Sequence, residues 1–239
     1  MSIQATETST QRVQSATPRL RVRNSTGTIV VRSGDEGQIT IQATKKVVDT
    51  IFGEPREEDL DKITLAITQE GDAVVVAVKL NSLESLYGKS TAIDLLISAP
   101  PQTQCDLRLN AGVIEVSGMI GRVLGRVNAG NIDLNQSLAR DVTAEVNAGN
   151  FHYRGPLASD ATLDVEVNVG NAQFYLPANA AFNFDAQTTA GQINLFGFSQ
   201  LVGGHPGRAQ ETHFTHPDAA GSLIVRVNTG NIDLNTQDE

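Results

Sequence analysis

The sequence predicts an all-β protein built as a β-solenoid, a parallel β-helix-like stack in which each rung of chain covers the edge of its neighbour. Three observations support this prediction. A short motif recurs at intervals of about 20 residues, its apolar residues alternate with polar ones, and a glycine holds a fixed position in every copy. The half of the chain before residue 100 is less regular and contains a predicted hairpin.

The repeated motif is clearest at 127–134, where it reads VNAGNIDL. From Gly112 onward the motif glycines are separated by 18, 19, 21, 21 and 39 residues. The last interval is close to two steps, which predicts that one unit there is degenerate or replaced. An earlier relative of the motif contains Gly27, 85 residues before Gly112. Near copies occur at 109–116, 146–153, 167–174, 188–195 and 227–234.

The motif glycine is predicted to be a structural corner. Before Gly130, apolar residues such as Val127 hold odd offsets, and after it, apolar residues such as Ile132 hold even offsets. A straight strand would send these two sets to opposite faces, so both reach one core only if the chain bends at the glycine. Glycine suits a bend because it adopts positive φ and allows close backbone contact. The predicted corners are Gly27, Gly112, Gly130, Gly149, Gly170, Gly191 and Gly230.

Asparagines flank the corner on both sides and predict two amide ladders. If rungs stack in register about 4.8 Å apart, equivalent side chains lie above one another and their amides hydrogen-bond along the stack. The alternative is a polar stripe that binds a ligand. The ladder before the corner comprises Asn110, Asn128, Asn147, Asn168 and Asn228, and the ladder after it comprises Asn131, Asn150, Asn171 and Asn231.

The N-terminal half contains a predicted hairpin, which turns near Gly71, and a short helix is expected near 56–62. We expect a single β-solenoid domain over 19–239, preceded by a flexible polar tail over 1–18. The alternative for the tail is a segment that covers a sheet edge. Strand-like runs occur at 20–31, 38–43, 63–68, 73–80 and 93–99.

Three stretches give the chain a family resemblance. They are LRVRNSTGTIVVRSGDEGQITIQATKKV from Leu20, the hairpin followed by AIDLLISAPP, and the NAG-x-I-x-V/L series that ends in VNTGNIDL. Over about residues 20–235 the chain resembles the bacterial adhesin-like domain family DUF4097, which is related to auto-transporter adhesin head domains. The resemblance implies a β-solenoid-like fold and a bacterial envelope or surface role. It supplies no catalytic motif.

Composition argues against several classes of function. The formal net charge is −9 and the pI is about 4.9, which disfavours a nucleic-acid binder and a protein held on an anionic membrane surface. No apolar stretch approaches the roughly 18–20 residues of a membrane span, so no membrane insertion is expected. The single cysteine, Cys105, excludes an internal disulfide. The polar N-terminus resembles no secretory signal, which predicts a cytoplasmic protein, whereas the family resemblance predicts envelope association.

The one candidate for chemistry is the Gly- and Pro-rich segment 197–221, which lies where a regular unit is missing. It contains His205, His213 and His216. Histidines beside a carboxylate can bind Zn²⁺ or another transition metal. An exposed loop is the simpler interpretation, and we predict no metal and no cofactor. The sequence contains no phosphate loop and no nucleophile elbow.

The sequence favours a non-enzymatic β-repeat scaffold that binds a protein partner or self-assembles. Open solenoid ends pair with other chains, and the final motif, at 227–234, is followed by only five residues. If that unit ends the stack, little covers it, so self-association through edges or ends is expected. The alternatives are an envelope-associated adhesion or stress-response module and a solenoid-type polysaccharide-active enzyme.

Overall fold

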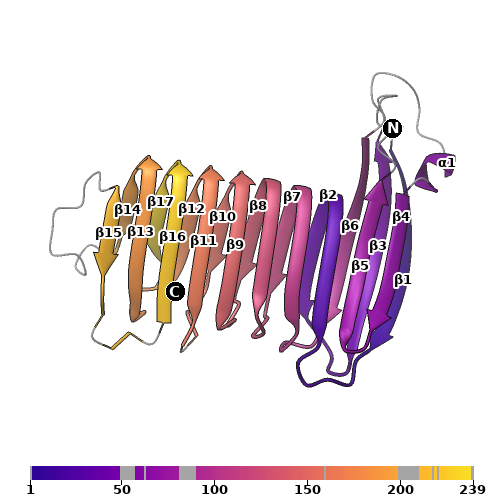
Figure 1. Cartoon of the computed structure of the whole chain (residues 1–239), viewed down its shortest axis with the longest axis horizontal. Helices are drawn as coiled ribbons and strands as arrows, with labels where there is room; N and C mark the ends of the chain where they lie inside the picture. Colours follow the sequence, from indigo (N-terminus) through magenta and orange to yellow (C-terminus); the bar gives the residue numbers. More distant parts are fainter. Residues whose placement is uncertain are drawn as a thin grey trace.

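A computed structural model describes residues 2–48, 57–61, 63–80, 90–158, 160–198, 210–216, 218–219 and 221–237 (Figure 1). These residues form 17 strands and one short helix, so the predicted all-β class is confirmed. The N-terminal elements are β1 (Ser2–Arg12), β2 (Arg19–Ser33), β3 (Gln38–Val48), α1 (Glu57–Leu60), β4 (Ile63–Glu70), β5 (Ala73–Leu80) and β6 (Ser90–Ala99). The C-terminal elements are β7 (Gln104–Ser117), β8 (Val123–Asn135), β9 (Asp141–Ala148), β10 (Phe151–Arg154), β11 (Thr162–Val169), β12 (Ala172–Pro177), β13 (Phe182–Ala190), β14 (Ile193–Phe196), β15 (Glu211–Phe214), β16 (Gly221–Thr229) and β17 (Ile232–Gln237).

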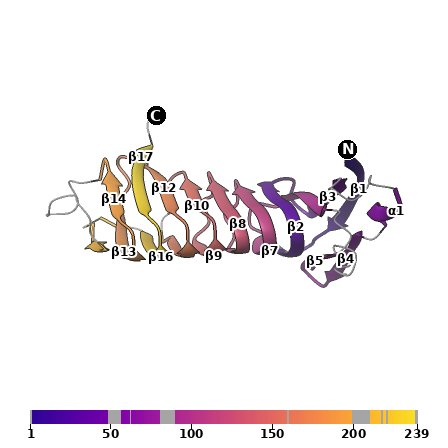
Figure 2. The same ribbon diagram turned by 90° about the horizontal axis from the view of Figure 1, so that it is seen from above.

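The strands belong to one hydrogen-bonded sheet that is folded at the glycine corners into two layers (Figure 2). The first layer contains the strand segments before the corners, and the second layer contains those after them. Strands β2, β7 and β8 run through the corner and belong to both layers. The first layer has the order β4-β5-β2-β7-β8-β9-β11-β16-β13-β15. The second has the order β1-β3-β6-β2-β7-β8-β10-β12-β17-β14.

The core lies between the two layers and consists mainly of Val, Ile and Leu. Burial alternates along each strand, as in β8, because successive side chains of a strand point to opposite faces. The layers are in direct contact: a Cβ atom on Gly125 in the first layer would lie 3.3 Å from Cδ1 of Ile132 in the second. Beside β15, the rings of Phe182, Phe184 and Phe214 pack with centroids 5.3–6.4 Å apart.

The corner glycines stack directly on one another. Neighbouring rungs are parallel and in register, so that Gly112 lies opposite Gly27 on one side and Gly130 on the other. A Cβ atom on Gly130 would overlap the carbonyl oxygen of Gly112. Gly191 is the one predicted corner without a positive φ. The φ angle lies between +122° and +140° at Gly27, Gly112, Gly130, Gly149, Gly170 and Gly230.

The rungs follow a different order in space from their order in the sequence. Strand β16 pairs with β11 on one side and β13 on the other, and β17 likewise lies between β12 and β14. Figure 1 shows yellow β16 between the orange strands β11 and β13. Gly230 therefore stacks between Gly170 and Gly191. One sequence expectation is corrected: the last motif lies inside the stack and not at its end. In the 39-residue interval, the described residues include the short strand β15, which pairs antiparallel with β13 and is not a regular rung.

The N-terminal segment is also different from the expected flexible tail over 1–18. Strand β1 pairs antiparallel with β3 along its full length, from Ser2 opposite Val48 to Arg12 opposite Gln38. It thus covers an edge of the second layer, which was the alternative interpretation. The predicted hairpin forms from β4 and β5, with Gly71 in its turn at a φ of +60°. Among the described residues, no helix has the length and apolarity needed to cross a membrane.

Candidate functional site

The two outer faces of the stack present the polar side chains from which a site can be built. Because the rungs are in register, residues at equivalent offsets from the corner form a row that runs along the stack. The first layer presents rows of charged residues and one row of asparagines. The second layer presents amides, carboxylates, a histidine and aromatic rings.

The asparagines before the corner form a continuous side-chain ladder on the first layer. Each Nδ2 donates a hydrogen bond to the Oδ1 of the asparagine in the neighbouring rung. The distances are 3.1 Å from Asn128 to Asn110, 2.9 Å from Asn147 to Asn128, 2.7 Å from Asn168 to Asn147, and 2.6 Å from Asn228 to Asn168. The last step joins rungs 60 residues apart in the sequence because β16 stacks on β11.

The asparagines after the corner use a different set of bonds. Here each Oδ1 accepts a hydrogen bond from the backbone amide of the next rung. The distances are 3.0 Å from Asn150 to Asn131, 3.1 Å from Asn171 to Asn150, and 3.0 Å from Asn231 to Asn171. Backbone donors at the bend are thereby satisfied, so a ligand bound along this row would have to compete with bonds that the bend itself uses.

A surface pocket of about 410 Å³ lies on the outer face of the second layer, and we call it the second-layer pocket. It spans neighbouring rungs of β7, β8, β10 and β12, so side chains far apart in the sequence meet in it. Its lining includes Glu115, Asp133, His152, Arg154, Gln173 and Tyr175.

Contacts between neighbouring rungs hold the pocket side chains in place. Nδ1 of His152 lies 2.6 Å from Oδ1 of Asp133. The guanidinium carbon of Arg154 lies 5.0 Å from the centroid of the Tyr175 ring, within the range of a cation–π contact. Gln173 donates to Asp233, at 3.3 Å. His152, Arg154 and Gln173 are therefore each held by a partner one rung away.

The pocket can bind a polar ligand through hydrogen bonds and one aromatic–guanidinium surface. Glu115 makes no side-chain hydrogen bond or ion pair within the described part of the chain. It lies opposite Asp133 in the parallel register, which makes this corner of the pocket acidic. In the described ranges, no group of three or more His, Cys, Asp or Glu side chains converges as a metal site.

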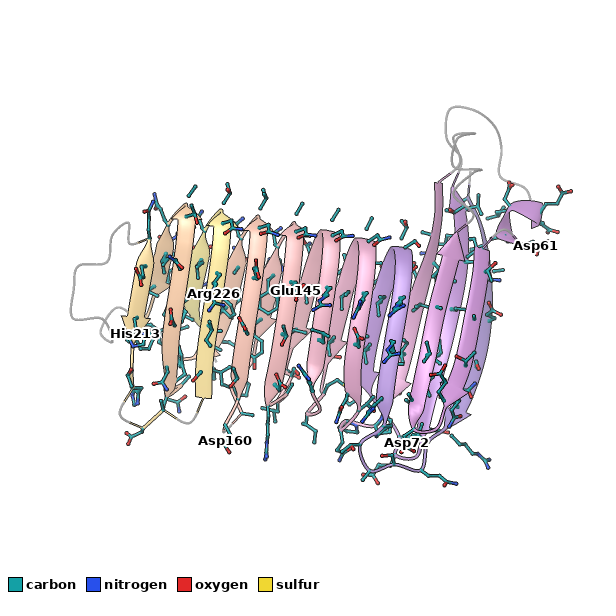
Figure 3. The ribbon with its side chains drawn as sticks, viewed as in Figure 1. Asp61, Asp72, Glu145, Asp160, His213 and Arg226 are labelled. Atoms are coloured by element: carbon teal, nitrogen blue, oxygen red, sulfur yellow. The ribbon has the colours of Figure 1, made fainter. Side chains whose placement is uncertain are left out.

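Of the three predicted histidines the structure describes His213 and His216, and neither belongs to a group of three or more potential metal ligands among the described residues. His213, on β15 (Figure 3), lies opposite Asp185, and its Nε2 is 3.5 Å from the Thr215 hydroxyl. His216 accepts a hydrogen bond from the backbone amide of Asp218 at 3.1 Å, which stabilises a local turn. His205 lies outside the described residues.

Cys105 and Tyr153 carry ionisable groups that are buried in the core, and Tyr153 also lines the second-layer pocket. Burial raises the pKa of the Cys105 thiol from 9.0 to about 12, so the thiol stays protonated and unreactive at neutral pH. Burial also raises the pKa of Tyr153, whose hydroxyl donates to the carbonyl oxygens of Ser137 at 3.0 Å and Pro156 at 2.7 Å. These hydrogen bonds anchor the loop after β8 to the loop after β10.

The sequence pattern did not reveal the second-layer pocket. His152 and Asp133 each lie three residues after a motif glycine. This shared position is the feature of the sequence that could have indicated their contact. Arg154 and Tyr175 also share an offset, five residues after Gly149 and Gly170. Their contact depends on the parallel register of β10 with β12, which only the structure supplies.

Comparison with known proteins establishes the fold. No protein-family model and no curated protein matches the sequence. A crystal structure from Clostridium sporogenes, described as a "putative cell adhesion protein", is similar with a TM-score of 0.52 and 14% identity, over 98% of this chain and 100% of that chain. A "putative adhesin" from Bacteroides fragilis gives a TM-score of 0.30 and 10% identity, over 96% of this chain and 97% of that chain. The first likeness shows a shared fold, and the second adds nothing to it.

Proposed function

We propose that this chain is a non-enzymatic, adhesin-like module that binds protein partners through a β-solenoid scaffold. The scaffold comprises one domain over 19–239, with β1 as the cover of one edge. Parallel rungs in register, corner glycines in van der Waals contact and two asparagine ladders support this description. Such a stack is rigid because each rung is hydrogen-bonded to both neighbours.

The adhesin-like assignment has two supports. The sequence resembles the DUF4097 family over about 20–235, and the fold is shared with the Clostridium sporogenes structure, whose description is that of a cell adhesion protein. We extend that description to this chain as a proposal: the module works at the bacterial envelope and contacts another protein there.

The second-layer pocket is the surface on which we expect the protein partner to bind. Its side chains His152, Arg154 and Gln173 are held by neighbours before any ligand arrives, and this preorganisation lowers the entropic cost of binding. Arginine and tyrosine, which meet here as Arg154 and Tyr175, are the residue types that most often dominate protein–protein affinity. The adjacent carboxylates Glu115 and Asp133 favour a partner segment that offers hydrogen-bond donors or a positive charge.

Binding to immobilised fibrinogen, fibronectin and collagen, measured by biolayer interferometry, tests the proposal. We expect a saturable interaction with at least one of these proteins. Arg154→Glu should weaken it at least tenfold, since an interface arginine removed from its aromatic partner costs about 1.4 kcal/mol or more. Arg226→Glu makes the same chemical change on the outer face of the first layer and should leave the affinity unchanged. Absence of binding to all three proteins, or equal losses in both variants, would refute the proposal.

One observation favours the polysaccharide-active enzyme as a second candidate. Glu115 and Asp133 are carboxylates in directly adjacent rungs, and both line the second-layer pocket. Paired carboxylates on one face are what glycoside hydrolysis requires. Release of reducing ends from a mixed panel of polysaccharides, lost in Glu115→Gln, would replace the binding proposal with this one. No release is the outcome that the binding proposal expects.

A further inference from the structure

The charged side chains on the outer face of the first layer are sorted by position along the stack. The rungs of β2, β7 and β8 carry six arginines and one aspartate on this face: Arg19, Arg21, Arg23, Arg108, Arg122, Arg126 and Asp106. The rungs from β9 to β15 carry six acids and one arginine: Asp141, Glu145, Asp164, Glu166, Asp185, Glu211 and Arg226. We call these sets the basic half and the acidic half. Figure 3 shows Glu145 and Arg226 on the same face.

This sorting costs stability within the single chain. Arg23, Arg108 and Arg126 lie directly opposite one another in three successive rungs, about 4.8 Å apart. Glu145 and Glu166 make the corresponding acidic pair. Like charges directly opposite in a sheet destabilise it, whereas alternating charges would stabilise it.

Ion pairs within the chain neutralise part of each half. Arg126 pairs with Glu145 at 2.9 Å and Arg122 with Asp141 at 3.0 Å, at the boundary between the halves. Away from the boundary, charges remain without any side-chain partner in the described part of the chain. These are Arg19 and Arg23 in the basic half, and Glu166, Asp185 and Glu211 in the acidic half.

We propose that the first layer binds a second copy of this chain face to face, with the two stacks running in opposite directions. A two-fold axis parallel to the strands, between β8 and β9, places β8 of one copy opposite β9 of the other and β7 opposite β11. Each basic half then faces an acidic half: Arg108 on β7 comes opposite Glu166 on β11, whereas Arg23 comes opposite Arg226 and Asp106 opposite Asp164 as the two like-charged pairs. Because a two-fold interface uses the same patch on both copies, one favourable contact occurs twice.

A second copy fits this face better than an unrelated acidic partner does. An acidic partner complements the basic half and is repelled by the acidic half in the same plane. Only a surface whose acidic and basic halves come in the reverse order complements both halves. The first layer of a second copy, turned by the two-fold axis, presents that reverse order. The inference rests on the charges of the first layer and not on the proposed function, because the second-layer pocket remains exposed in such a dimer.

The pair formed by Arg108 and Glu166 gives the sharpest test, since β7 lies opposite β11 in the proposed dimer. We expect wild type to sediment at twice its 25.5 kDa in 20 mM salt and as a monomer in 1 M salt, where the Debye length falls to about 3 Å. Arg108→Glu alone and Glu166→Arg alone should each be monomeric in low salt. Mixing the two variants should restore the dimer, because both contacts in the mixed pair then join opposite charges. Glu115→Arg, on the second layer, should dimerise like wild type.

Three outcomes would reject the second copy as the occupant. The first is a monomeric wild type at millimolar concentration in low salt. The second is a dimer that survives both single substitutions. The third is a pair of folded monomeric variants, judged by circular dichroism, that stay monomeric when mixed. Salt-sensitive binding of monomeric wild type to polyglutamate would assign the basic half to an acidic partner instead.

Discussion

The carbonyl oxygen of Gly112 occupies the space that a Cβ atom on Gly130 would need. The same relationship links Gly130 to Gly149 and continues along the stack. Every corner except Gly191 combines a positive φ with backbone contact to the next rung, so a side chain there would both strain the bend and separate the rungs. The glycine column is therefore the least replaceable part of the scaffold.

Replacing Gly130 by alanine should cost at least about 4 kcal/mol of unfolding free energy, because strain at φ +137° adds to a backbone clash. Urea denaturation followed by circular dichroism measures this cost. Gly71→Asn is the matched control. Gly71 also has a positive φ, but no atom lies within 4 Å of the site of its Cβ, and asparagine tolerates this conformation. The control should lose less than about 1 kcal/mol. Similar losses at both sites would contradict the contact between corners.

The two asparagine ladders should respond in opposite ways to aspartate. Asn147 donates its Nδ2 to Asn128, so Asn147→Asp removes a donor and brings two oxygens together. Asn150 accepts from the backbone amide of Asn171, and aspartate retains that acceptor. We expect Asn147→Asp to be at least as destabilising as Asn147→Ala, with costs of about 0.5–1.5 kcal/mol. At the other ladder, Asn150→Asp should be milder than Asn150→Ala, which leaves a backbone amide unpaired and costs about 1–3 kcal/mol.

Thermal denaturation of these four variants distinguishes the two roles. At position 147 the aspartate variant should be no more stable than the alanine variant. At position 150 the aspartate variant should be the more stable of the two. A common ranking at both positions would mean that the ladders act only through side-chain volume or charge. Ionic strength serves as a control, because a change in hydrogen-bond pattern should persist in high salt while a surface charge effect should not.

The buried thiol of Cys105 should make stability fall at alkaline pH. Its pKa is about 12 in the folded chain and 9.0 when exposed, so above pH 9 the unfolded chain has lost a proton that the folded chain retains. The contribution of the Cys105 thiol to the free energy of unfolding is fully present below pH 9. It declines as the pH rises toward 12, by up to about 1.4 kcal/mol per pH unit. Cys105→Ala should reduce this slope in urea titrations at pH 8, 9 and 10.

Reactivity of the same thiol gives an independent check. Ellman's reagent at pH 8 should modify less than a tenth of the folded protein and one thiol per chain in urea, because the chain has a single cysteine. Rapid modification without denaturant would show that the layers open at β7.

Truncation at the two termini should have unequal effects. Removal of residues 221–239 takes out β16 and β17, which leaves β11 and β12 separated from β13 and β14. Removal of residues 1–13 uncovers the outer edge of β3 and removes the buried Val13 side chain from one end of the core. We expect the C-terminal deletion to abolish cooperative unfolding and the N-terminal deletion to lower the Tm by a few degrees. Circular dichroism on both deletions tests this, and equal effects would argue that β16 and β17 lie at an end of the stack.

Much of the rung itself was predictable because its signals are local. The phase change at Gly130, the alternation of Val127 with its polar neighbours and the asparagines beside most corners all repeat within about 20 residues. Such patterns fix which side chains face the core. The N-terminal strand was harder to predict, because β1 is rich in Ser and Thr and is stabilised by pairing with β3 rather than by an apolar face of its own.

The sequence alone determined the shape of one rung, and the tertiary structure decided which rungs are neighbours. Every rung presents the same backbone donors and acceptors, so a motif can pair with any other copy and spacing does not reveal its partner. The insertion of β16 between β11 and β13, and the pairing of β2 with β7 across 85 residues, are therefore set by long-range packing. The second-layer pocket and the sorted charges of the first layer follow from that order, because each is made of side chains that only rung stacking brings together.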